Sequence, residues 1–162
     1  MFTSRVSSLA CLTFLVTAGI SLSGFAADPA NKLCPMMTDE AIETDHTVQV
    51  AGVAVGLCCG KCEKLWVKNE KYYIKAGIEQ GLLPQLKGKE AELGLDKVEL
   101  LKQRFCPFNP KTIVAPDSPS VDYKGTKVYF FNAAAQKKWE AAPDAEAEKA
   151  IKARLLPQLE GK

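Results

Sequence analysis

A segment of eight residues occurs twice in this chain, with a single substitution between its two copies. It reads LLPQLKGK at residues 82–89 and LLPQLEGK at residues 155–162, which is an offset of 73 residues. The same offset aligns Trp66 with Trp139, Gly52 with Gly125, and Ile78 with Ile151. A shared offset over such a span is typical of a tandem duplication, so the sequence predicts two diverged copies of one small module.

Each copy has the pattern of a β-hairpin. Apolar residues alternate with polar ones on both sides of a turn, which falls at Ala51-Gly52 in the first copy and at Lys124-Gly125 in the second. A period of two residues on both sides of a glycine-containing turn is the usual signature of a hairpin. We therefore expect one hairpin in each copy.

Each hairpin is followed by residues that favour helices. In the second copy Asn132 is a good N-cap for a first helix, Pro143 ends that helix, and Asp144 is expected to cap a second one. The expected helices span residues 59–68 and 70–80 in the first copy, and residues 133–142 and 144–156 in the second.

The predicted fold class is α+β, with two small modules that each contain a Cys-Pro knuckle, a β-hairpin and two helices. We expect the first module at residues 28–86 and the second at residues 105–162. Residues 87–104 are rich in leucine and charge, which favours a helical connector between the modules. Modules this small have thin cores and commonly depend on a metal ion, disulfides or a partner.

Residues 1–26 have the organisation of a secretory signal peptide. Arg5 provides a positive start, residues 6–25 carry no charge, and the stretch ends in small residues at Ala26. Such segments are removed on export, so we expect a periplasmic or secreted protein with no membrane span after cleavage. A retained membrane anchor is the alternative, since an uncharged run of this length could span a bilayer. The many serine, threonine and glycine residues favour the signal peptide.

Charge and composition argue against two classes of function. The net charge is +2 and lysine and glutamate are interleaved, which differs from the basic surface of a nucleic-acid-binding protein. The chain has a single histidine, His46, and no phosphate-binding loop, so no pair of nucleophile and base suggests an enzyme. We expect a non-enzymatic protein with no nucleic-acid partner.

The cysteines give the first indication of function. Five of them follow residue 26: Cys34, Cys58, Cys59, Cys62 and Cys106. Outside the cytosol thiols tend to form disulfides, and an odd number leaves at least one thiol free, intermolecular or bound to a metal.

Four of these cysteines are predicted to form a metal site. Cys59 is expected at the N-cap of the first helix and Cys62 at its third position, where the helix N-terminus favours thiolates. Cys58 precedes them directly, and the antiparallel hairpin can return the chain to the neighbourhood of Cys34. The predicted ligands are therefore Cys34, Cys58, Cys59 and Cys62, for an ion such as zinc or Cu(I).

Other interpretations of the same residues remain open. The cysteines could form structural disulfides, or the Cys59-x-x-Cys62 pair could do thiol–disulfide chemistry as in thioredoxin-like proteins. Met36 and Met37 could add thioether ligands to a soft ion, although such methionines more often fill a core. His46 could be a ligand, but an exposed position is more common for it.

The first copy resembles the YHS module and the related TRASH metallochaperone-like module. The residues that carry this resemblance are Cys34-Pro35-Met36, the turn at Gly52, Cys58-Cys59-Gly60-Lys61-Cys62, Trp66, Asn69 and Tyr72. The resemblance implies a zinc-finger-like fold and a role in binding, sensing or trafficking of heavy metals, and it implies no established reaction.

The second copy resembles the same modules without their thiols. The resemblance lies in Cys106-Pro107, residues 121–131, Trp139 and Pro143. Where the first copy has Cys58, Cys59 and Cys62, the second has Phe131, Asn132 and Ala135. We therefore expect the second copy to be a degenerate module with a structural role or a surface for a protein partner.

Overall fold

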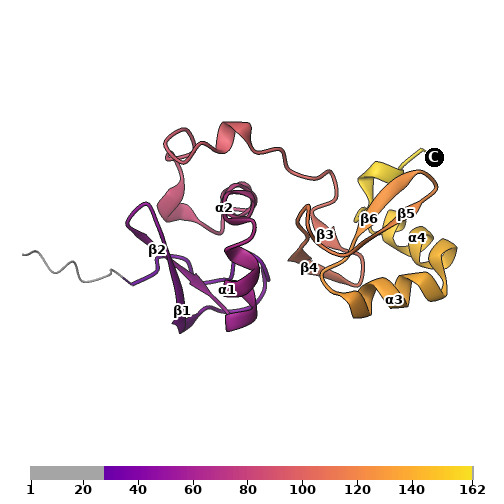
Figure 1. Ribbon diagram of the computed structural model, residues 1–162, viewed down its shortest axis with the longest axis horizontal. Coiled ribbons are helices and arrows are strands. Elements are labelled where there is room, and N and C mark those ends of the chain that lie inside the picture. The colour runs from indigo at the N-terminus through magenta and orange to yellow at the C-terminus, as the bar shows by residue number, and fades with distance from the viewer. Residues whose placement is uncertain (1–27, 162) are drawn as a thin grey trace, which may run out of the picture.

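The computed structural model describes residues 28–161 (Figure 1). The predicted signal peptide at residues 1–26 lies outside this range. The described part combines four α-helices with three two-stranded antiparallel hairpins, in agreement with the predicted α+β class. The strands are β1 Glu43–Val50, β2 Val53–Leu57, β3 Phe105–Cys106, β4 Asn109–Ile113, β5 Ser120–Tyr123 and β6 Thr126–Tyr129. The helices are α1 Gly60–Trp66, α2 Glu70–Glu79, α3 Ala133–Ala141 and α4 Pro143–Lys152.

Each module has its own apolar core beneath its hairpin and helices. The first core is built around Trp66, Tyr73 and Leu57, and the Trp66 and Tyr73 rings stack with centroids 6.1 Å apart. The second is built around Trp139 and Phe130, whose ring centroids lie 5.6 Å apart. The two tryptophans are therefore the central side chains of the two cores.

The same backbone conformations recur 73 residues apart. Both hairpin turns have positive φ angles at two successive residues, 47° and 74° at Ala51 and Gly52 and 53° and 73° at Lys124 and Gly125. Short 3-10 helices at Pro84–Leu86 and Pro157–Leu159 end the two modules. The two predicted turns are thus confirmed, and their left-handed conformation suits the right-handed twist of the hairpins.

A polar side chain closes each module in the same way. Asn31 donates hydrogen bonds to the carbonyl oxygens of Leu33 and Gly56, and it accepts one from the Gly56 amide. Gln103 makes the equivalent three bonds with Phe105 and Tyr129 in the second module. Both side chains are almost completely buried, and each joins the residues just before its Cys-Pro pair to the second strand of its hairpin.

The helix starts follow the sequence prediction with one correction, and α4 ends at Lys152, short of the predicted residue 156. Asn132 caps α3 as expected, because its side-chain oxygen accepts a hydrogen bond of 2.9 Å from the Ala135 amide. Asp144 is not the cap of α4, which starts at Pro143 with Ala142 as its N-cap. Proline suits the first helical position because it has no N–H to leave unsatisfied. Asp144 lies in the first turn instead and accepts a hydrogen bond from the Tyr123 hydroxyl.

The predicted helical connector at residues 87–104 is also corrected. It contains a single 3-10 helix, Leu95–Lys97, between turns and extended segments. Gly88 and Gly94 have φ angles of 88° and 65°, which end any helix there. Leu95 is buried against the first core, and Lys75 in α2 donates hydrogen bonds to the carbonyl oxygens of Leu95 and Val98.

The second module packs against the first through β4. The Ile113 amide donates to the Met36 carbonyl oxygen at 2.8 Å, and the Thr38 amide donates to the Lys111 carbonyl oxygen at 2.8 Å. Figure 1 shows the β3–β4 hairpin between the two groups of helices. None of the helices in the described part of the chain has the length and apolar character that a bilayer-spanning helix requires.

Candidate metal centre

Three cysteines from three separate segments meet beside the N-terminus of α1. Cys34 lies in the knuckle (residues 34–38), Cys58 follows β2, and Cys62 lies in the first turn of α1. Their Sγ atoms all lie within 4.8 Å of one another, and the Sγ atoms of Cys58 and Cys62 are 3.6 Å apart. Cys34 and Cys62 are completely buried, whereas Cys58 is partly exposed. An ion could therefore reach the group from the side of Cys58.

The first hairpin explains why residues so far apart in the sequence meet. Glu43 at the start of β1 pairs with Leu57 at the end of β2, so Cys58 returns to the segment that precedes β1. The knuckle is closed by a hydrogen bond of 2.9 Å from the Cys34 amide to the Glu40 carbonyl oxygen. An antiparallel β-bridge between Leu33 and Ala41, the residues on either side of this pair, also holds the knuckle closed.

Cys34 is the thiol that ionises most readily in the group. A hydrogen bond with the Cys62 thiol lowers the pKa of Cys34 to about 6. Burial acts in the opposite direction, but the backbone amides of Met37, Met36 and Cys58 also stabilise the thiolate. Amides that point at one sulfur place partial positive charge around it, so the knuckle is organised for an anionic sulfur.

The other two thiols of the group retain their protons. Burial, followed by the negative charge of Cys34, raises the pKa of Cys58 to about 12. The pKa of Cys62 is raised further, by its hydrogen bond to Cys34 and by burial. The metal-free group is therefore one thiolate shared with two thiols, and a cation bound by all three sulfurs would displace the two protons.

Cys59, the fourth cysteine predicted as a ligand, lies beside the group and outside it. It is the N-cap of α1 as predicted, and its Sγ atom is 3.9 Å from that of Cys58. It is not among the three cysteines whose Sγ atoms all lie within 4.8 Å of one another. Burial raises the pKa of Cys59, but the amides of Cys62 and Lys61 at the helix N-terminus outweigh it, and the pKa is lowered.

The sequence left open whether Met36 or Met37 could be a metal ligand, and the structure distinguishes between them. Met36 is completely buried in the first core. Met37 turns its sulfur to the thiols, and its Sδ atom lies 3.7 Å from Cys58 Sγ. The sequence indicated that either residue could be a ligand, but only the conformation of the knuckle shows which one faces the group.

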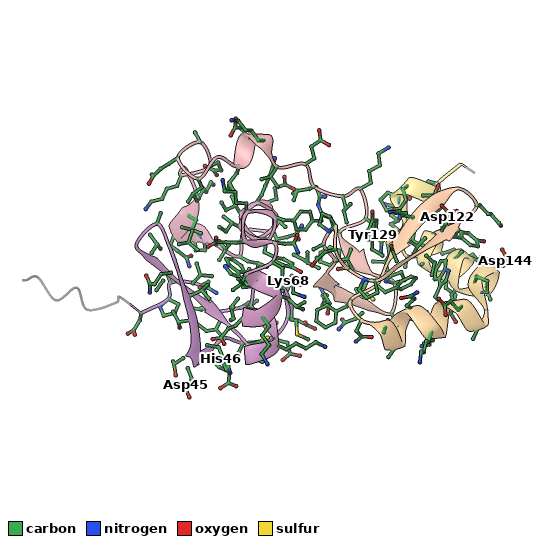
Figure 2. The ribbon with its side chains drawn as sticks, viewed as in Figure 1. Asp45, His46, Lys68, Asp122, Tyr129 and Asp144 are labelled. Carbon is green, nitrogen blue, oxygen red and sulfur yellow. The ribbon has the colours of Figure 1, made fainter. Side chains whose placement is uncertain are left out.

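His46 has a partner away from the thiol group. Its Nδ1 atom lies 3.2 Å from Glu63 Oε1, and both side chains are about one-third exposed. Figure 2 shows His46 on the strand next to α1, near the exposed Asp45. Within residues 28–161 no imidazole or carboxylate joins the three-cysteine group.

The equivalent region of the second module has apolar and aromatic residues. Phe131 takes the place of Cys58, and Lys61 of the first module lies with its Nζ atom 4.7 Å from the centre of the Phe131 ring. Cys106, which corresponds to Cys34, is buried in β3 and does not belong to the group. The second module thus contributes a contact beside the site and no second cluster of thiols among its described residues.

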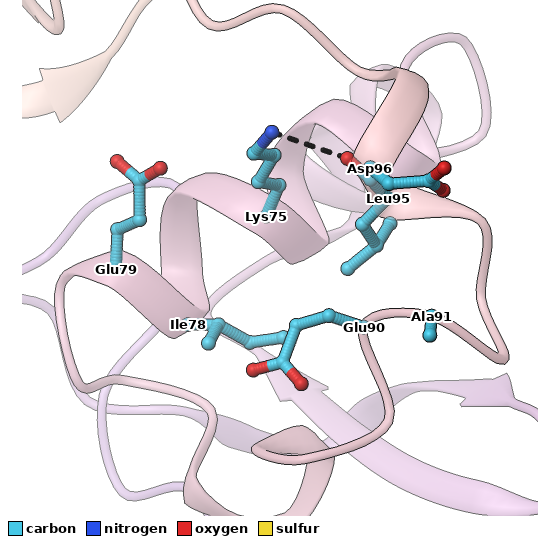
Figure 3. A pocket seen from close by; sticks show the side chains of 7 residues that line it. All are labelled: Lys75, Ile78, Glu79, Glu90, Ala91, Leu95 and Asp96. Carbon is cyan, nitrogen blue, oxygen red and sulfur yellow. Dashed lines mark hydrogen bonds between the residues drawn. The ribbon is translucent and has the colours of Figure 1, made fainter.

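A surface pocket lies on another part of the first module. It is bounded by α2 and residues 90–96, and it contains no cysteine (Figure 3). The Lys75 ammonium group at its edge donates to the Leu95 carbonyl oxygen at 3.1 Å. This pocket is separate from the thiol group and offers no chemistry that relates to it.

Comparisons with protein-family models, with curated proteins and with solved structures gave no match. The resemblance to the YHS and TRASH modules, and the zinc-finger-like character that it implies, therefore stay predictions from the sequence. The structure itself shows three cysteines close enough together to hold a metal ion.

Proposed function

We propose that the protein binds a soft or borderline transition-metal ion, zinc or copper, through Cys34, Cys58 and Cys62. The observation that carries this proposal is the mutual distance of the three Sγ atoms, all within 4.8 Å. Four sulfurs placed tetrahedrally at about 2.3 Å from an ion are separated by about 3.8 Å. The 3.6 Å between Cys58 and Cys62 is close to this value, so little rearrangement is needed for both to bind one ion.

The residues around the sulfurs support binding. The hydrogen bond with the Cys62 thiol, together with the amides of the knuckle and of Cys58, favours a thiolate at Cys34, which provides the first ligand at neutral pH. Metal ligands are held in place by such outer contacts, and their loss commonly weakens binding. Cys58 and Cys62 then exchange their protons for the ion, so the affinity should rise with pH.

The proposed role is trafficking, storage or sensing of the ion outside the cytoplasm. The location follows from the predicted signal peptide at residues 1–26, and the type of role follows from the resemblance to the YHS and TRASH modules. No catalytic role is proposed. The second module would act as a support for the thiol site and as a surface for a protein partner, since β4 packs on the knuckle.

Elemental analysis of the protein purified without oxygen tests this proposal. We expect about one zinc or copper ion per chain, lost in the double variant Cys58→Ser/Cys62→Ser and kept in Cys106→Ser. Cys106 is the matched control, because it is a buried free cysteine outside the group.

Thiol titration with and without a reductant separates the alternatives. No metal, together with thiols that appear only after reduction, would overturn the proposal in favour of a structural disulfide. A readily reversible potential near that of cellular thiol buffers would favour a redox protein instead, since structural disulfides have much lower potentials.

A further inference from the structure

We propose that the thioether of Met37 is a further ligand of the thiol group and that the site therefore selects Cu(I) over zinc. This inference rests on the proposed metal-binding function. It is carried by one contact, the 3.7 Å between Met37 Sδ and Cys58 Sγ. That distance matches the roughly 3.8 Å expected between two sulfur ligands of one tetrahedral ion.

The position of Met37 is fixed by its backbone. Its carbonyl oxygen accepts a hydrogen bond of 2.9 Å from the Glu40 amide, and the residue also forms a β-bridge with Thr112 of β4. Met36, its neighbour, is completely buried in the first core. The hydrogen bond from Glu40 and the bridge with Thr112 thus fix the Met37 backbone, while its sulfur lies beside Cys58.

The chemistry of the donors determines which ion fits. Zinc sites in proteins take cysteine, histidine and carboxylate ligands, whereas thiolate combined with thioether is a soft set that favours Cu(I). His46 is paired with Glu63, and within the described residues no histidine or carboxylate joins the group. Three thiols with one thioether form a donor set made only of sulfur.

Cys59 is the competing candidate for the fourth position. Its Sγ atom lies 3.9 Å from Cys58 Sγ, which alone would also suit a shared ion. It lies outside the group of three mutually close sulfurs, and although it is the N-cap residue of α1 its side chain makes no capping hydrogen bond. A site that used Cys59 would have four thiols, the donor set of structural zinc sites. The two candidates therefore predict different metals.

The test compares Met37→Leu with Met36→Leu, because leucine conserves the volume and removes only the sulfur. Cu(I) affinity is measured without oxygen by competition with bicinchoninate, and zinc affinity by competition with a colorimetric chelator. We expect Met37→Leu to weaken Cu(I) binding by about tenfold or more, on the scale seen for loss of contacts that support a metal site. Zinc affinity should change little, and Met36→Leu should change neither. X-ray absorption of the Cu(I) complex should show one sulfur fewer in Met37→Leu.

The outcomes separate this inference from the proposed function. If the wild-type protein binds neither ion, both proposals are wrong. If it binds an ion but Met37→Leu behaves like Met36→Leu, only the role of Met37 is overturned. The same holds if Cys59→Ser, and not Met37→Leu, produces the tenfold loss. An equal loss of zinc and Cu(I) affinity in Met37→Leu would overturn the selectivity.

Discussion

Ile113 donates its backbone N–H to the carbonyl oxygen of Met36 over 2.8 Å. Met36 belongs to the knuckle that presents Cys34 and Met37, whereas Ile113 ends strand β4 of the second module. The Ile113 side chain is only 1 % exposed and packs in the core of the first module. The second module, which lacks the thiol cluster, therefore contributes a buried side chain to the core that contains Cys34 and Cys62.

Replacement of Ile113 by alanine should weaken both folding and metal binding. Truncation of a buried isoleucine costs about 2–5 kcal/mol of unfolding free energy. Because the knuckle packs on this side chain, we also expect lower metal affinity in protein that is still folded. Urea unfolding and a metal competition assay measure the two effects.

Leu159→Ala is the matched control for Ile113→Ala. Leu159 is buried in the core of the second module, away from the knuckle. We expect a comparable loss of stability with unchanged metal affinity in the folded protein. If the two variants lowered the affinity equally, β4 would have no specific role at the thiol site.

Gly77→Ala should destabilise the protein although alanine is the better helix former. Gly77 lies within α2, and a Cβ atom there would be 2.8 Å from Leu83 Cδ1 and 3.1 Å from Pro35 Cβ. Leu83 is almost completely buried and Pro35 is rigid, so neither can yield easily. We expect an overpacking cost of about 1–3 kcal/mol, which exceeds the gain of about 1 kcal/mol in helix propensity.

Urea unfolding measures this change, and Ala150→Gly provides the comparison. Ala150 occupies the position 73 residues later, in α4 of the second module. There the loss should reflect helix propensity and the removal of one buried methyl group. If Gly77→Ala raised the unfolding free energy, the close approach of α2 to the knuckle would have no energetic consequence.

The hairpins and helices could be predicted because their signals are local. The turn at Lys124-Gly125 needs two left-handed residues, and the cap at Asn132 depends only on an amide three residues later. The prediction of a helical connector was wrong because the structure there depends on packing against distant residues. The connector was predicted to be helical because it is rich in leucine and charge, but Leu95 packs on the first core, and Gly94 takes a left-handed conformation that a continuous helix cannot contain.

The part of the site that the hairpin brings together could be predicted from the sequence. Cys34 and Cys58 come together because an antiparallel pair returns the chain, and Cys62 follows one helical turn later. The side on which Cys59 and Met37 lie depends on the detailed conformation of the helix start and the knuckle. The contact between β4 and Met36 joins two modules, so no pattern within either module indicates it.

Cys59 should be the first cysteine to react with iodoacetamide in the reduced, metal-free protein at pH 7. It is partly exposed and its pKa is lowered, so more of it is thiolate than in an ordinary cysteine, and that thiolate is accessible. Cys34 is also ionised but is completely buried, and the pKa of Cys58 is raised to about 12. Peptide mass spectrometry over a time course ranks the sites.

Alkylation of the metal-loaded protein tests whether Cys59 is a ligand. If only Cys34, Cys58 and Cys62 bind the ion, metal should leave Cys59 as reactive as in the metal-free protein. Protection of Cys59 by the metal would restore the four-cysteine site predicted from the sequence. Cys106, which is buried outside the group, should react slowly with or without metal.

The stability of the reduced, metal-free protein should pass through a maximum near pH 9. The pKa of Cys34 is about 6 in the folded protein against 9.0 for an ordinary thiol, because of its hydrogen bonds with Cys62 and the knuckle amides. Between these values the unfolded chain binds the extra proton, so stability rises with pH and this contribution is lost as pH falls towards 6. Above pH 9 the raised pKa values of Cys62 and Cys58 reverse the slope, because the folded protein then holds more protons.

Urea midpoints from pH 6 to pH 10, in the presence of a reductant and a chelator, measure this profile. Cys34→Ser should lose most of the rise between pH 6 and pH 9, because serine does not ionise there. The lowered pKa of Cys59 should leave a smaller rise. Cys106→Ser should keep the rise, since that thiol lies outside the group. A wild-type profile that is flat up to pH 9 would mean that Cys34 is not held as a thiolate, and the first metal ligand would then have to lose its proton on binding.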